Sequence, residues 1–153
     1  MFEYETMREA LSERIPEIFH TVRYAENQIF WGDQEIPMYC YYEALEHLFI
    51  DLVNGETKDD ELLKRVLAFM EDMANSDDIE VVNLLQVGIL EGLFGLENNI
   101  FIEMENMLLP NTAQLLENAK VWFLAPNGYG SPKPKPKPKL SNWDSFIKKL
   151  KSL

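Results

Sequence analysis

The sequence predicts an all-α protein, with a single compact domain of about six or seven antiparallel helices around a buried central helix, arranged as a bundle or an α-α superhelix. Apolar residues recur at intervals of three and four along most of the chain up to about residue 123. One segment, 79–96, is apolar nearly all the way round a helix, so other helices must wrap it. Nothing calls for a strand, and the short loops favour neighbouring antiparallel helices.

The first segment, about 4–28, has helical periodicity, and Pro16 predicts a break within it because proline disfavours helical geometry in the residue before it. A turn is predicted at Gly32-Asp33, beside Trp31, which makes this loop a candidate surface patch. Pro37 suits the first turn of a helix that stops at Asn54-Gly55.

Residues 62–73 form an ordinary amphipathic helix, and the polar run 75–78 then caps the central helix. Gly88, Gly92 and Gly95 fall on one side of that helix, which predicts a shallow groove for a closely crossing helix. We expect no membrane span, because polar residues interrupt the segment and no run of 18 apolar residues exists.

A shorter helix follows from about residue 100, and we expect Pro110 to end it and Asn111-Thr112 to cap the last helix of the body. The predicted domain is 1–125. A stiff, basic linker of alternating proline and lysine covers 126–140. A short amphipathic helix, 141–153, follows it and is too small to be stable alone, so it should dock on its own body, on a second copy to make a homodimer, or on a partner. The residues expected to dock are Trp143, Phe146, Ile147 and Leu150.

Charge is unevenly distributed between the two parts of the chain. Residues 1–131 carry 25 acidic and 7 basic side chains, whereas residues 132–153 carry 1 and 7. Such an acidic body repels phosphates, which disfavours nucleic-acid binding through it, and it attracts basic proteins. Cys40 is the only cysteine, and the start of the chain lacks the basic and apolar regions of a signal peptide, so we expect a cytoplasmic protein.

No constellation of catalytic residues is visible. Glu17 and His20 have the E-x-x-H spacing of di-iron bundles, which need this motif twice. The other histidine, His47, has Ala44 instead of glutamate three positions before it, so the second motif is absent. Glu43, Glu46 and His47 nearly match an inverted zinc-protease motif, with glutamate in place of its first histidine. We therefore expect no enzyme activity, no metal site and no cofactor.

The acidic residues have two interpretations. They are helix starts and a solvated face, or they form a surface matched to a basic partner. Under the second interpretation the predicted partner-binding residues are Trp31, Asp33, Glu35, Glu43, Glu46, Asp59, Asp60, Glu61, Asp77, Asp78 and Glu80. Tyr39, Tyr41 and Tyr42 are either interface anchors or core packing.

The stretch DELLKRVLAFMEDMANSDDIEVVNLLQVGILEGL, at 60–93, resembles a family of small, uncharacterised all-helical bacterial proteins. The family is similar to the immunity proteins of bacterial toxin systems in size, acidity and lack of catalytic motifs. This resemblance implies a non-enzymatic protein that neutralises a cognate toxin, such as a basic nuclease, by occlusion. The alternative is an interaction or scaffold module whose C-terminal helix docks on a partner chain or a second copy.

Overall fold

The computed structural model describes residues 1–124. Within this range the chain is all-α with no strand, as predicted, and forms one compact domain. Its α-helices are α1 (Met7–Arg14), α2 (Val22–Trp31), α3 (Met38–Asn54), α4 (Asp60–Ala74), α5 (Ile79–Leu85), α6 (Asn98–Met107) and α7 (Pro110–Leu124). Shorter turns of helix are η1 (Tyr4–Thr6), η2 (Pro16–His20), η3 (Gln86–Leu90) and η4 (Glu91–Gly95). The predicted linker and C-terminal helix lie outside the described residues.

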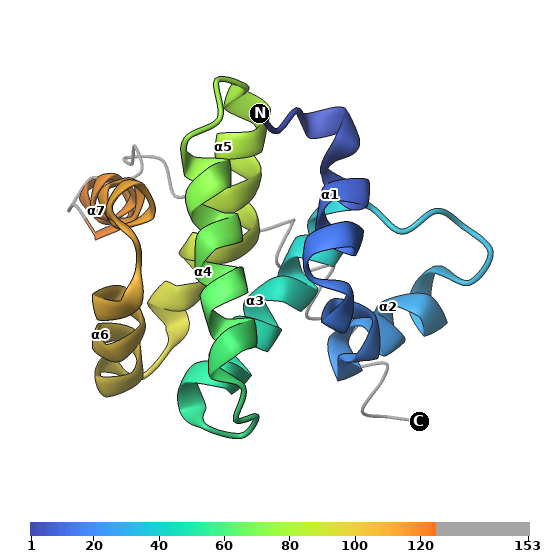
Figure 1. Ribbon diagram of the computed structural model, residues 1–153, viewed down its shortest axis with the longest axis horizontal. Helices are drawn as coiled ribbons and strands as arrows, with labels where there is room; N and C mark the ends of the chain where they lie inside the picture. The colour runs from blue at the N-terminus through green and yellow to red at the C-terminus, as the bar shows by residue number, and fades with distance from the viewer. Residues whose placement is uncertain (125–153) are drawn as a thin grey trace.

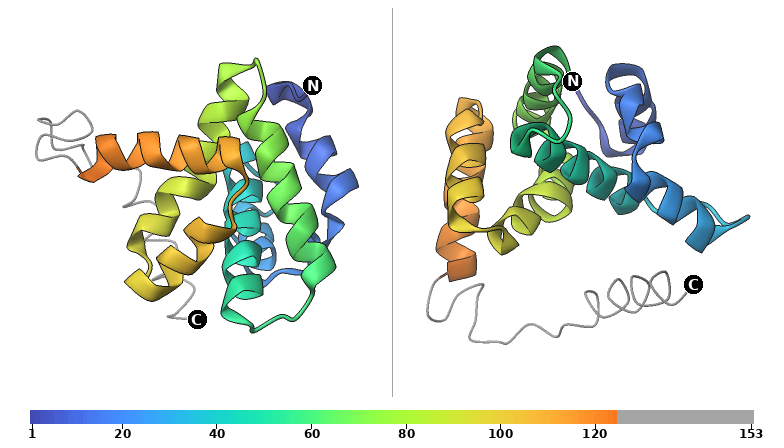
Figure 2. Two further views of the ribbon diagram at one scale, coloured as in Figure 1. Left: turned by 60° about the vertical axis from the view of Figure 1, so that its left-hand side comes forward. Right: turned by 90° about the horizontal axis from the view of Figure 1, so that it is seen from below.

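Helix α3 is the element around which the others gather. It packs against α1, α2, α4, α5, α6 and η3. Figure 1 shows α4 in front of α3, with α1 and α2 on one side and α6 and α7 on the other. The two further views agree with this arrangement (Figure 2). One side of α3 therefore faces the core, where Tyr42, Leu45 and Phe49 are fully buried.

The predicted helix ends are found at several positions. Ile15 has non-helical dihedral angles and Pro16 opens η2, so the predicted break is confirmed. Gly55 ends α3 with φ +78°, in the left-handed region that favours glycine. Asp59 caps α4, since its side chain accepts a hydrogen bond from the backbone N–H of Leu62 at 3.0 Å.

The central segment is buried as predicted, but it is not one continuous α-helix. It consists of α5, a π-helical turn (η3) and a 3₁₀ turn (η4). Three glycines within eight residues weaken the helical preference here, and η3 lies tightly against α3. A Cβ atom at Gly88 would lie 3.2 Å from the Cβ of Tyr42, so the predicted close crossing is with α3. Ile79 and Val87 are exposed, which the all-round apolar pattern did not predict.

The start of α7 differs from the prediction. Pro110 is the first residue of α7 rather than the end of the preceding helix, and Asn111 and Thr112 lie inside its first turn. Its backbone N–H groups donate to the carboxylate of Glu71 on α4 instead of to a residue of its own. A side chain 40 residues away thus performs the capping that was expected of Asn111 and Thr112.

Candidate partner-binding surface

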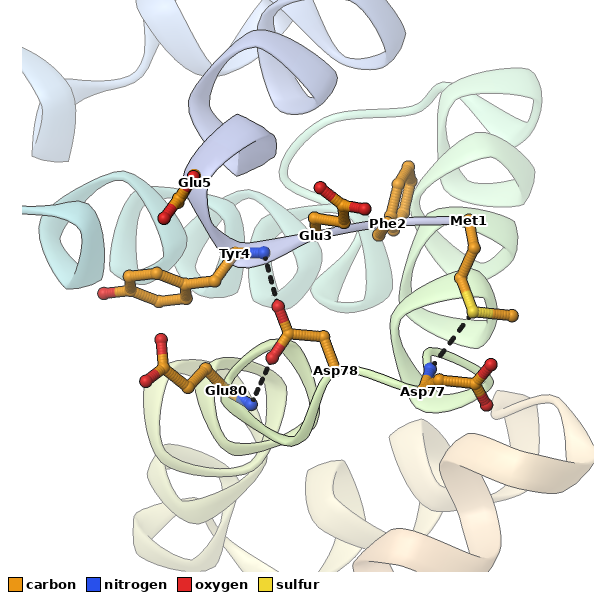
Figure 3. Close-up of a pocket in the computed structure, with 8 residues that line it drawn as sticks. All are labelled: Met1, Phe2, Glu3, Tyr4, Glu5, Asp77, Asp78 and Glu80. Atoms are coloured by element: carbon orange, nitrogen blue, oxygen red, sulfur yellow. Dashed lines mark hydrogen bonds between the residues drawn. The ribbon is translucent and has the colours of Figure 1, made fainter.

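A pocket of about 480 Å³ opens where the start of the chain meets the start of α5. Five of its eight lining residues are acidic, and none is lysine or arginine. Figure 3 shows Asp78 in the middle, with Tyr4 and Glu80 on one side of it and Met1 and Asp77 on the other. This acidic pocket is lined by Met1, Phe2, Glu3, Tyr4, Glu5, Asp77, Asp78 and Glu80.

Asp78 builds the acidic pocket by joining two distant parts of the chain. Its Oδ1 accepts a hydrogen bond from the backbone N–H of Glu80 at 2.9 Å, which caps α5. Its Oδ2 accepts one from the backbone N–H of Tyr4, also at 2.9 Å. The hydroxyl of Ser76 adds a second tether by donating to the carbonyl of Phe2 at 2.8 Å. Both oxygens of Asp78 are therefore used to hold the fold.

The other four carboxylates of the acidic pocket are exposed: Glu3, Glu5, Asp77 and Glu80. None of them forms an ion pair with another described residue. The nearby Tyr39 is 41% exposed, and its phenol pKa is raised by burial first and then by Tyr4, Glu80 and Glu91. The pocket thus combines four carboxylates that form no ion pair within the described residues with the ring of Tyr4, and Tyr39 lies nearby.

A second group of charges lies between α2 and α3 and is called here the α2–α3 cluster, comprising Arg23, Glu26, Glu43, Glu46 and His47. Arg23 lies 3.5 Å from a carboxylate oxygen of Glu26 and 3.5 Å from one of Glu43. It also donates to Nε2 of His47 from Nη2 at 2.8 Å and Nε at 3.2 Å. These bonds require Nε2 to carry a lone pair, so His47 is neutral with its proton on Nδ1.

Burial changes the protonation of this cluster. Burial raises the pKa of Glu43 to about 7 against the lowering effect of Arg23. Burial and then Glu43 raise the pKa of Glu46 to about 8. Burial and then Arg23 lower the pKa of His47 to about 4. Three carboxyl groups surround one guanidinium, and burial favours the protonated forms of two of them, Glu43 and Glu46.

Glu46 occupies the space that Gly92 leaves on η4. A Cβ atom at position 92 would lie 1.8 Å from Oε2 of Glu46, so a larger residue there would force the flexible end of the Glu46 side chain to move. The side chain of Glu46 is 12% exposed. The glycine side of the central segment therefore receives a carboxyl group at this point, as well as the tyrosine that crosses at Gly88.

The structure separates the predicted partner-binding residues. Asp77, Asp78 and Glu80 lie in the acidic pocket, and Glu43 and Glu46 lie in the α2–α3 cluster. Asp59, Asp60 and Glu61 begin α4, where Asp59 is a cap and Glu61 pairs with Arg65 at 3.0 Å. Asp33 is exposed, Glu35 pairs with Arg8, and Trp31 packs edge-on against Phe30. Trp143, Phe146, Ile147 and Leu150 lie outside the described residues.

Other candidates from the sequence take structural roles. Tyr42 is fully buried and donates to the carbonyl of Met7 at 2.8 Å. Tyr41 lies against Arg8 and Tyr24. Glu17, half of the E-x-x-H spacing, pairs with Arg65. In residues 1–124 no three His, Cys, Asp or Glu side chains are grouped so that they could hold a metal ion.

Two sets of site residues were missed from the sequence. Glu3 and Glu5 join the acidic pocket because Tyr4 contacts Asp78, a pairing across 74 residues that no local pattern reveals. Arg23 is the central residue of the α2–α3 cluster. Its pairing with Glu26 could have been predicted from the sequence, because residues three positions apart lie on the same face of a helix.

Among the helices of the described part of the chain, none is both long enough and apolar enough to cross a membrane. No curated protein and no solved structure matches this chain. Residues 8–122 match the model of a family described as a domain of unknown function, DUF7674, and the chain belongs to that family.

Proposed function

We propose that this chain is a binding protein that neutralises a basic protein by covering it, as an immunity protein does with its cognate toxin. The proposed partner is a nuclease whose cleft is basic because it binds phosphates. Carboxylates of this chain would occupy that cleft in place of the phosphates, so inhibition would be occlusion rather than chemistry.

The excess of acidic side chains is the observation that carries the proposal. Residues 1–124 hold 25 acidic and 7 basic side chains. Five of the basic ones already pair with carboxylates of the described body: Arg8, Arg14, Arg23, Arg65 and Lys120. The remaining negative charge produces a field that speeds the encounter with a basic partner.

The acidic pocket supports the proposal as a point of contact. Basic side chains of the partner could place their charges near Glu5 and Glu80 on one side of Asp78 and near Asp77 on the other. Tyr39, which is partly exposed and near Tyr4 and Glu80, is a tyrosine, a residue type that often contributes strongly to interface energy.

Growth rescue tests the proposal. The toxin candidate is the product of the reading frame adjacent to the gene for this chain, and its expression alone should arrest growth. Co-expression of this chain should restore growth. The variant Glu5→Gln/Asp77→Asn/Glu80→Gln should restore it poorly, because three exposed charges of the acidic pocket are removed while the cap residue Asp78 is kept.

A matched control removes three exposed charges elsewhere, as Glu13→Gln/Glu97→Gln/Glu103→Gln, and should rescue growth fully. Equal rescue by both triple variants would place the interface away from the acidic pocket. Failure of the unmodified chain to rescue growth would overturn the proposed neutralisation of this toxin and favour the scaffold alternative.

A further inference from the structure

One face of the body combines half-buried carboxylates with exposed apolar side chains, and it shares no residue with the acidic pocket. It is called here the α2–α3 face. Helix α3 lies at its centre, with α2 packed on one side and η3 on the other. Helical spacing puts Arg23, Glu26 and Phe30 in one row on α2, and Glu43, Glu46 and Ile50 in one row on α3.

The α2–α3 face gathers three partly buried carboxyl groups around one guanidinium. Glu26, Glu43 and Glu46 have side chains only 28%, 25% and 12% exposed, and Arg23 is the guanidinium between them. His47 adds no charge because it accepts from Arg23 and is neutral. Burial favours the protonated forms of Glu43 and Glu46, and a lysine or arginine placed beside them would favour the ionised forms, so the face is suited to a basic occupant.

The same elements, α2, α3 and η3, also carry apolar side chains with exposed surface. Phe30 is 44% exposed and Val87, on η3, is 51% exposed. Ile50 is half-buried on α3. The occupant therefore needs both lysines or arginines and apolar side chains, arranged on one short element.

Residues 141–153 of the same chain have this composition. Trp143, Phe146, Ile147 and Leu150 fall on one side of a helix, and Lys148, Lys149 and Lys151 lie around them. The 16 residues between Leu124 and Ser141 would span about 50 Å in the extended polyproline form. A body of 124 residues has a radius of gyration of only about 14 Å, so this segment reaches any face of it.

Tethering favours the segment's own body over a second copy. A linker long enough to span the distance makes docking on the same chain intramolecular, which favours it over docking on a second copy in dilute solution. The charge of the segment also distinguishes it from an acidic or neutral partner. None of the residues that line the acidic pocket belongs to this face, so the proposed function and this inference rest on different residues.

We propose that residues 141–153 dock on the α2–α3 face of their own chain, with lysines of the segment against Glu43 and Glu46 and its apolar side against Phe30 and Val87.

Photo-crosslinking of the full chain tests this docking. p-Benzoylphenylalanine in place of Phe146 keeps an aromatic side chain on the apolar side of the segment and reacts with neighbouring C–H groups on illumination. Crosslinked peptides from the monomer band should map to 22–31, 38–50 or 86–94. The variant Glu43→Gln/Glu46→Gln should lower the yield severalfold, whereas the control Glu13→Gln/Glu103→Gln should leave it unchanged.

A second variant distinguishes loss of docking from misfolding of the body. Lys148→Gln/Lys149→Gln/Lys151→Gln leaves every residue of the described body unchanged and should lower the yield as much as the double glutamate variant. Crosslinks to other parts of the body, or no crosslinks at all, would overturn the proposal. A product found only in the dimer band, with a yield that rises with protein concentration, would also overturn it and indicate exchange between two copies.

Discussion

Glu71 on α4 caps α7 through Thr112. One carboxylate oxygen of Glu71 accepts from the backbone N–H of Thr112 at 2.8 Å and from its hydroxyl at 2.9 Å. The other oxygen accepts from the backbone N–H of Asn111 at 3.0 Å and from its side-chain amide at 2.9 Å. Four donors at a positive helix end thus converge on a single side chain from another helix.

The first prediction concerns this cap. Glu71→Ala should lower the free energy of unfolding by about 2 kcal/mol at pH 7, because several donors at the start of α7 lose their charged acceptor. Urea denaturation followed by circular dichroism measures this loss. Glu103→Ala, an exposed change on α6, serves as the control and should have little effect.

The same cap gives a pH dependence. Burial alone would raise the pKa of Glu71, but the hydrogen bonds from Asn111 and Thr112 outweigh it and lower the pKa below its usual value. A lowered carboxyl pKa stabilises the fold above the unfolded pKa, and that stability is lost as the pH falls through the folded pKa. The difference between the unmodified chain and Glu71→Ala should therefore shrink at acidic pH. A constant difference from pH 7 to pH 3 would show that the carboxylate charge is unimportant to the cap.

A second prediction compares two neighbouring aspartates. Asp78→Ala should destabilise the chain by about 1–2 kcal/mol, because Asp78 caps α5 and holds Tyr4. Asp77→Ala should change stability by less than about 0.5 kcal/mol, since Asp77 is exposed. Thermal denaturation of the two variants is the check. Equal midpoints would contradict the role given to Asp78.

A third prediction couples Gly92 to Glu46. Gly92→Ala should be destabilising because its Cβ would displace the carboxyl group of Glu46 from the position where it lies near Arg23 and His47. In a Glu46→Ala background the same change should cost less, with a coupling free energy of at least about 1 kcal/mol in a double-mutant cycle. Gly95→Ala is the control, since nothing lies within 4 Å of a Cβ there, and its coupling to Glu46→Ala should be near zero.

The sequence predicted the fold better than the site, and particular residues show why. Pro16, Gly55 and Asp59 act through dihedral angles or hydrogen bonds within a few residues, so their roles are visible locally. The cap by Glu71 and the pairing of Asp78 with Tyr4 join residues 41 and 74 positions apart, and only the packed fold creates them. The π-helical turn η3 likewise follows from the tight packing of Gly88 on α3.

The sequence predicted which acidic residues belong to the candidate site, but not which of them lie together on one surface. Asp77, Asp78 and Glu80 were expected as acidic contacts, and the structure adds Glu3 and Glu5 to them in the acidic pocket. The α4 acids at 59–61 were expected on the same surface, yet they begin a different helix and lie outside the pocket. Charge alone does not reveal such grouping, because neighbouring positions on a surface need not be close in the sequence.

A fourth prediction concerns the pKa of Glu46. Arg23, Glu43 and His47 face its carboxyl group, and burial first and then Glu43 raise its pKa to about 8 against the lowering effect of Arg23. The variant Lys148→Gln/Lys149→Gln/Lys151→Gln should show this value in a carboxyl-detected NMR titration. The unmodified chain should show a lower pKa, since lysines docked on the α2–α3 face favour the ionised form. Identical titrations would contradict docking at Glu46.

The dissociation constant of the purified complex with the toxin candidate, measured at low and high salt, tests the proposed function most directly. The constant should rise about tenfold or more with salt, because ions screen attraction between surfaces of opposite charge. At low salt, Glu5→Gln/Asp77→Asn/Glu80→Gln should raise it about tenfold as well, whereas Glu13→Gln/Glu97→Gln/Glu103→Gln should leave it nearly unchanged. A dissociation constant that depends neither on salt nor on the acidic-pocket substitutions would contradict neutralisation of a basic partner through this surface.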